Sequence, residues 1–152
     1  MINKAVIVAG LSMLPVTELR LGIPYGVANG LGVWQALTFA LIGNILIIPI
    51  IFFFLDYLHK HFMKIRYYER MFNMYSSWLL GRFSKNKEKA WPYIAFFAFV
   101  ALPLPGTGAY TGCLLSWLLG MKRLRSYVSV ILGVIVDGVI VSLITAGIIK
   151  VI

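Results

Sequence analysis

The chain has 152 residues, of which 61% are hydrophobic and only 12% are charged. Soluble domains contain about 45–50% apolar and about 25% charged residues, so this composition excludes an ordinary soluble protein and a disordered one. A single cysteine excludes a disulfide framework, and with two histidines it leaves no convincing metal-ligand set. The formal net charge of +9 is concentrated, because eight of the 14 Lys and Arg residues lie between Lys60 and Lys89. We therefore expect residues 1–152 to form a single membrane domain with one basic face and no cofactor.

The first apolar block, 5–32, is interrupted near its centre by prolines and glycines that include Pro15, Gly22 and Pro24. Proline removes a helical hydrogen bond, and glycine loosens the backbone. Each half of the block has about a dozen residues, or roughly 18 Å of helix, which is too short to cross a bilayer. Two short arms that meet at such a break predict a re-entrant helical hairpin, whose tip must be buried in protein or face water.

The next block, 34–58, is apolar apart from Gln35, Asn44 and Asp56, and it predicts a transmembrane helix with Asp56 as an interfacial cap. The segment 59–91 that follows is basic. Within it, apolar and aromatic residues recur every three or four positions over 62–83, which predicts an amphipathic helix in the cytoplasmic interface. At the start of this segment, His59 and His61 are expected to be solvated.

The block 93–120 is broken by prolines and glycines like the first, and 126–149 is apolar apart from Asp137. A second basic cluster, Lys122 to Arg125, lies between them. If 93–120 crossed the membrane, this cluster would lie outside, against the positive-inside tendency. A second re-entrant hairpin over 93–120 keeps both basic clusters cytoplasmic and both termini outside, and 126–149 is then the second transmembrane helix.

The two halves share sequence features, since Leu14-Pro15 and Gly32 match Leu102-Pro103 and Gly120 at a separation of 88 residues. This predicts an inverted repeat, an architecture typical of transporters, and coincidence between two apolar segments is the alternative. The expected fold is an all-α integral membrane protein with two units, each a re-entrant hairpin followed by a transmembrane helix, joined by the amphipathic segment. Two full spans hardly enclose a pathway, so we expect a homodimer.

Ionisable residues at membrane depth are costly and tend to be functional. Glu18 and Arg20 lie in the first break, where an extended tip would direct both side chains toward one cavity. In this cavity Glu18 would be a titrating carboxylate, and the guanidinium of Arg20 beside it could bind a phosphate or a carboxylate. The alternative is a structural ion pair. Asp137 lies near the midplane of its helix and is a candidate for proton coupling, or else a protonated group hydrogen-bonded to a carbonyl or to Thr107.

The second break supplies hydroxyl groups from Thr107, Tyr110 and Thr111. A helix that restarts near Ala109 would direct its free N–H groups into the cavity, which suits an anionic headgroup or a carboxylate. The alternative is a tight turn whose glycines only permit close helix packing.

Two stretches of the chain resemble the signatures of a known family: Glu18-Leu-Arg20-Leu-Gly22-Ile-Pro24, and Pro103-Leu-Pro105-Gly106-Thr107-Gly108-Ala-Tyr110-Thr111-Gly112. They are similar to those of the Putative small multi-drug export protein family, a distant relative of the DedA (SNARE-associated, VTT-domain) superfamily. The resemblance implies an integral membrane protein with two opposed re-entrant loops, whose motif residues, Pro24, Pro103, Pro105, Gly106 and Gly108 among them, belong to the substrate or ion site. DedA relatives are implicated in moving polyprenyl-phosphate or phospholipid carriers across the bilayer, in connection with the proton gradient. This sequence lacks the arginines that those relatives place in the second hairpin.

These observations favour a DedA-like transporter or lipid translocase in the plasma membrane of a prokaryote, with membrane lipids and protons as partners and no nucleic acid. The alternative is a proton-coupled exporter of small cationic compounds, in which Glu18 and Asp137 exchange protons for substrate. Arg20 argues against this alternative unless Glu18 neutralises it. An enzyme is not expected, because no nucleophile–base pair or metal-ligand set is evident.

Overall fold

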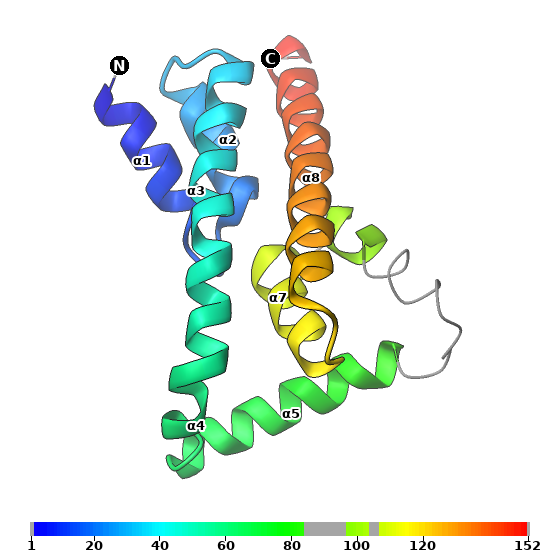
Figure 1. Cartoon of the computed structure of the whole chain (residues 1–152). Coiled ribbons are helices and arrows are strands. Elements are labelled where there is room, and N and C mark those ends of the chain that lie inside the picture. Colours follow the sequence, from blue (N-terminus) through cyan, green and yellow to red (C-terminus); the bar gives the residue numbers. More distant parts are fainter. Residues whose placement is uncertain (1, 84–96, 104–106, 152) are drawn as a thin grey trace.

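The computed structural model describes residues 2–83, 97–103 and 107–151, with side chains up to Ile148. These residues form helices and no strand (Figure 1). The helices are α1 (Ile2–Ser12), α2 (Glu18–Ala28), α3 (Val33–Phe53), the π-helical turn η1 (Phe54–Leu58), α4 (His59–Phe62), α5 (Arg66–Phe83), α7 (Ala109–Leu118) and α8 (Arg123–Val151), and residues 97–101 are also helical. The expected all-α class is confirmed over the described residues.

Two helical stretches are long and apolar enough to cross a membrane, Val33–Phe62 and Arg123–Ile148. In Figure 1 they run in opposite directions along the length of the molecule. A Cβ atom on Gly138 of α8 would lie only 2.8 Å from Leu37 of α3, so the glycine permits close packing between them. Both helices also expose large apolar side chains, such as Leu46 and Leu143, which suits contact with lipid.

The first hairpin consists of α1 and α2, which meet at a turn about halfway along α3 (Figure 1). The break is shorter than the sequence indicated, because it covers only residues 13–17. Gly22 and Pro24 lie inside α2, and the proline is accommodated within the helix. Gly22 packs against Ser12 of α1, where any larger side chain would overlap the serine hydroxyl.

The helical residues 97–101 and α7 belong to the predicted second hairpin, 93–120, and the start of α7 lies at about the level of the first tip in Figure 1. A Cβ atom on Gly133 of α8 would lie 2.6 Å from Val100, so this hairpin packs closely against α8. Residues 84–96 and 104–106 lie outside the described part of the chain.

Residues 90 positions apart share local backbone features in the two hairpins. Positive φ angles occur where α2 and α7 begin, at Glu18 (42°) and Gly108 (127°), and where they end, at Gly30 (87°) and Gly120 (63°). The following helices, α3 and α8, also begin 90 residues apart. The pairing of Gly32 with Gly120 was therefore wrong, because Gly32 has φ −62° and precedes α3, whereas Gly30 ends α2 in the way that Gly120 ends α7.

The helix boundaries also differ from those expected. The first long helix continues through η1 and α4 to Phe62, beyond the predicted end of 34–58, and α8 begins at Arg123 instead of at the start of 126–149. The amphipathic segment contains α5, which lies across the end of the molecule that also holds α4 (Figure 1).

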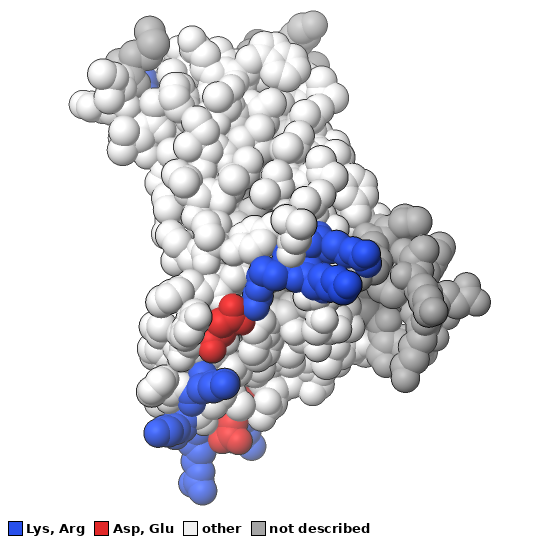
Figure 2. Space-filling view, viewed as in Figure 1, with Lys and Arg blue, Asp and Glu red and all other residues white. Residues whose placement is uncertain are grey.

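Lys and Arg side chains form a band across the lower half of the face in Figure 2, while most of the upper half is uncharged. Exposed basic residues come from α4 and α5, among them Lys60 and Arg66, and from Lys122 and Arg125 at the start of α8. This basic end of the molecule is opposite to the end that holds both chain termini (Figure 1).

Candidate functional site

The two hairpin tips meet at the buried side chain of Glu18. Its carboxylate accepts a hydrogen bond from the backbone N–H of Tyr110, with 3.4 Å between the nitrogen and Oε1. A Cβ atom on Gly108 would overlap this carboxylate, so only glycine allows the approach. Because the first N–H groups of a helix lack intrahelical partners and carry partial positive charge, Glu18 of the first hairpin stabilises the N-terminus of α7 in the second.

Arg20 connects three parts of the molecule. Its Nη2 donates to Thr107 Oγ1 at 2.9 Å and to the Leu102 carbonyl at 3.3 Å. The same nitrogen lies 3.9 Å from Asp137 Oδ2 in α8. Thr107 also donates to the Leu102 carbonyl, at 2.6 Å. Leu102 follows the helical residues 97–101, so the arginine and the threonine satisfy a carbonyl that the helix break leaves open.

The first hairpin is capped in the same way by the second. The Tyr110 hydroxyl donates to the Met13 carbonyl, and the Thr17 hydroxyl donates to the Leu11 carbonyl, both near the C-terminal end of α1. Thr17 and Thr107 lie 90 residues apart, as do Arg20 and Tyr110. Each hairpin thus satisfies an open helix end of the other.

Asp137 lies at the centre of α8 with only 1% of its surface exposed. Its Oδ1 atom has no hydrogen-bond partner among the described residues. Asp137 lies beside the Arg20 guanidinium and Glu18 lines the same cavity as Arg20, so two buried carboxyl groups belong to one cluster with a single guanidinium. When all three are ionised the group carries one net negative charge, so it can accept one proton or one monovalent cation.

Three cavities lie along the hairpin contact, and two of them each share lining residues with the third, the tip cavity. The tip cavity, about 400 Å³, is lined by Glu18, Arg20, Thr107 and their neighbours. The terminal-side cavity, also about 400 Å³, lies between α2 and α8 and shares Arg20 and Pro103 with the tip cavity. The aromatic cavity, about 600 Å³, lies among α3, η1, α5 and α7 and shares Pro15 and Thr111 with it.

Most of the residues predicted from the sequence gather at this contact. Those that do so are Glu18, Arg20, Pro103, Thr107, Gly108, Tyr110, Thr111 and Asp137. Pro24 lines the terminal-side cavity, and Pro105 and Gly106 lie outside the described residues. The expected extended tip was wrong, because Glu18 and Arg20 both belong to α2, where side chains two positions apart point roughly 200° apart. They still line one cavity, but they contact different groups of the second hairpin.

The contact of α5 with the site was not predicted from the sequence. The Tyr75 hydroxyl lies 3.0 Å from that of Thr111 in α7, within hydrogen-bond distance. The expectation that His59 is solvated was wrong, because it is 6% exposed and its ring centroid lies 4.1 Å from that of Phe72 and 5.2 Å from that of Trp117. The aromatic spacing of the amphipathic segment was the available signal, but it did not distinguish packing on protein from packing on lipid.

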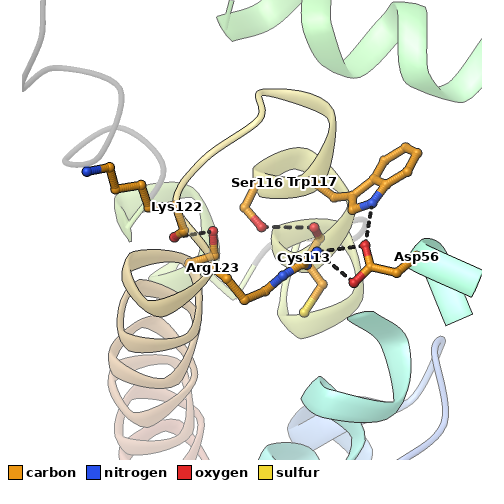
Figure 3. A network of polar contacts seen from close by, with 7 residues as sticks. Asp56, Cys113, Ser116, Trp117, Lys122 and Arg123 are labelled. Carbon is orange, nitrogen blue, oxygen red and sulfur yellow. Dashed lines mark hydrogen bonds and ion pairs between the residues drawn. The ribbon is translucent and has the colours of Figure 1, made fainter. Parts of the chain in front are cut away.

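Asp56 belongs to a separate network, at the basic end of the molecule (Figure 3). Its two carboxylate oxygens lie 2.6 and 2.7 Å from Nη2 of Arg123, and Oδ1 accepts from the Trp117 indole at 3.0 Å. The Arg123 guanidinium also lies 4.5 Å from the centroid of the Phe52 ring. Asp56 therefore connects η1 to the start of α8 instead of capping a helix at the interface.

The chain was compared with known protein families, curated proteins and solved structures. A family model described as Putative small multi-drug export protein matches residues 18–140, which extend from the first tip to the middle of α8. The chain belongs to this family. No curated protein and no solved structure matches it. As a member of an export family with two apolar helices of spanning length, the protein is located in a membrane.

Proposed function

We propose that this small multi-drug export protein is a proton-coupled exporter of small cationic compounds, with the tip cavity as its substrate site. The observation that carries the proposal is that two buried carboxyl groups belong to one cluster with a single guanidinium, Asp137 beside Arg20 and Glu18 in the same cavity as Arg20. From the sequence alone, the positive charge of Arg20 argued against a cationic substrate. Because Asp137 lies 3.9 Å from Arg20 and offsets its charge, the carboxylate of Glu18 is left to bind either a proton or a cation. Mutually exclusive binding at one carboxylate couples export to the proton gradient.

We place both hairpins in the membrane as re-entrant elements that enter from opposite sides, so that the two halves form an inverted repeat. The shared φ pattern at a spacing of 90 residues and the reciprocal capping of the hairpins support this arrangement. The basic end supports a cytoplasmic position for the central segment in the plasma membrane of a prokaryote. With two full spans per chain, a homodimer would enclose the pathway more completely.

A second candidate function is DedA-like translocation of a polyprenyl phosphate or phospholipid. It is favoured by Arg20 and the N-terminus of α7, since both groups bind phosphate well. In this case the Glu18 carboxylate would have to leave the α7 N-terminus before a headgroup could bind there. The two candidates therefore assign opposite roles to Glu18 and Arg20.

Removing one charge at a time in proteoliposomes separates the candidates. For a cation exporter, Glu18→Gln abolishes ethidium transport driven by an imposed pH gradient, while Arg20→Gln retains ethidium binding. For an anionic-lipid translocase, Arg20→Gln abolishes movement of a fluorescent polyprenyl phosphate, and Glu18→Gln retains binding of that lipid. Glu69→Gln, which removes an exposed carboxylate from α5, is the matched control. Ethidium transport that survives Glu18→Gln would exclude the proposed exchange.

The topology is tested by cysteine labelling in a Cys113→Ala background. Single cysteines at Lys64 and Lys122 should react with an impermeant maleimide from the cytoplasmic side, and a cysteine at Gly30 from the other side. Labelling of positions 64 and 122 from opposite sides would refute the second re-entrant hairpin.

A further inference from the structure

The aromatic cavity is lined by five aromatic side chains from three elements. Phe54 comes from η1, Tyr68, Phe72 and Tyr75 come from α5, and Tyr110 comes from α7. The rest of the described lining is aliphatic apart from Pro15 and Thr111, and no charged side chain belongs to it. A volume of about 600 Å³ lies within the range of about 300–1,000 Å³ that is typical of sites for drug-sized ligands.

Two of these rings are held in place by His59. Tyr68 Oη lies 3.0 Å from His59 Nδ1, and the centroid of the Phe72 ring lies 4.1 Å from that of the imidazole. Burial raises the pKa of the Tyr68 phenol, so its ring stays neutral at physiological pH. The rings therefore form a preorganised surface without formal charge.

Such a surface selects among ligands by charge and hydration. Aromatic faces attract cations, and the attraction grows when the cation is desolvated. A small hydrated ion would lose its water shell in this apolar space without polar groups to replace it. An organic cation with a dispersed charge loses little hydration and gains both ring contacts and apolar burial.

We infer that the aromatic cavity binds lipophilic organic cations and delivers them to the tip cavity. This inference rests on the proposed exporter function, for which it assigns the entry site. The aromatic cavity shares Pro15 and Thr111 with the tip cavity, where the Glu18 carboxylate lies. The hydroxyl contact between Tyr75 and Thr111, at 3.0 Å, lies at this boundary and joins α5 to the second hairpin.

The test is equilibrium binding of tetraphenylphosphonium to the purified full-length protein in detergent, with empty micelles as the blank. Phe72→Leu and Tyr75→Leu remove one ring each while keeping an apolar side chain, and each should raise the Kd about 3- to 30-fold, as expected for a partly desolvated cation–π contact. Tyr67→Leu is the matched control, because this tyrosine is 75% exposed on the same helix. Circular dichroism and gel filtration verify the fold of each variant.

Tetraphenylborate has almost the same shape as tetraphenylphosphonium and the opposite charge, so the wild-type protein should bind it at least tenfold more weakly. Equal affinity for the two ions, or an equal Kd for Phe72→Leu and Tyr67→Leu, would overturn the inference. Cation binding that depends on the rings, in a protein that transports no cation in proteoliposomes, would instead refute the exporter proposal and leave the site assignment standing. Transport that Phe72→Leu and Tyr75→Leu both leave unchanged would refute the entry site alone.

Discussion

Replacing Gly108 by alanine tests whether the hairpin tips meet as described. Gly108 has φ 127° and ψ −162°, a conformation that costs a residue with a side chain about 1–3 kcal/mol. The added methyl group would also overlap the Glu18 carboxylate and displace it from the α7 N-terminus. A carboxylate at a partly buried helix N-terminus contributes up to about 2 kcal/mol. The two effects together should lower the free energy of unfolding by about 2–4 kcal/mol, or about 30- to 800-fold in the folding equilibrium.

The free energy of unfolding can be measured in mixed detergent micelles by tryptophan fluorescence, as a double-mutant cycle with Glu18→Ala. In that background the overlap is relieved, so Gly108→Ala should cost about 1–2 kcal/mol less than in the wild type. Gly120→Ala is the control, because Gly120 has φ 63° and open space around its missing Cβ atom, and its cost should not depend on Glu18. An additive cycle for Gly108 and Glu18 would refute the contact between the tips.

The remaining predictions concern polar contacts. Asp56→Asn should lower the free energy of unfolding by about 1 kcal/mol, because both of its carboxylate oxygens contact one nitrogen of Arg123 but the pair is partly exposed, and the coupling between Asp56→Asn and Arg123→Gln should fall at high salt. Tyr110→Phe should cost about 1–3 kcal/mol, because a carbonyl at the end of α1 loses its donor; an unchanged stability would exclude this cap. Asp137→Asn should preserve folding but weaken cation binding and transport, because the charge of Arg20 is then no longer offset beside Glu18; transport that stays at the wild-type level would refute this role of Asp137.

The sequence predicted the helices and their breaks well, because these depend on local patterns. Proline and glycine located the turn between α1 and α2, and uninterrupted apolar length located α3 and α8; part of the second predicted break lies outside the described residues. The limits of the first break were less accurate. Pro24 was assigned to the break, but a proline inside α2 removes only the bond to the Arg20 carbonyl, and packing of the helix tolerates this loss.

The contacts within the site could not be predicted, because they join residues far apart in the sequence. Arg20 and Thr107 are separated by 87 residues, and Asp56 and Arg123 by 67. Its charge identified Arg20 as unusual at membrane depth, and Asp56 was expected to be an interfacial cap, but no local pattern predicts the distant partner of either residue. The burial of His59 likewise depends on α5 folding back against α7, which the amphipathic pattern alone does not require.

Because the two hairpins cap each other, their separation breaks several contacts together. When the tips part, the Met13 carbonyl loses Tyr110 and the α7 N-terminus loses Glu18, whereas the Leu102 carbonyl loses Arg20 and keeps Thr107. Unpaired groups of this kind cost about 1–3 kcal/mol each, so the parted state needs water or substrate to replace them. In the proposed cycle a cation that attracts the Glu18 carboxylate removes its contact with the α7 N-terminus, whereas a proton on Glu18 weakens that contact without supplying a cation. Substrate and proton would thus act on the same contact between Glu18 and the α7 N-terminus. This is the physical requirement for exchanging one for the other across the membrane.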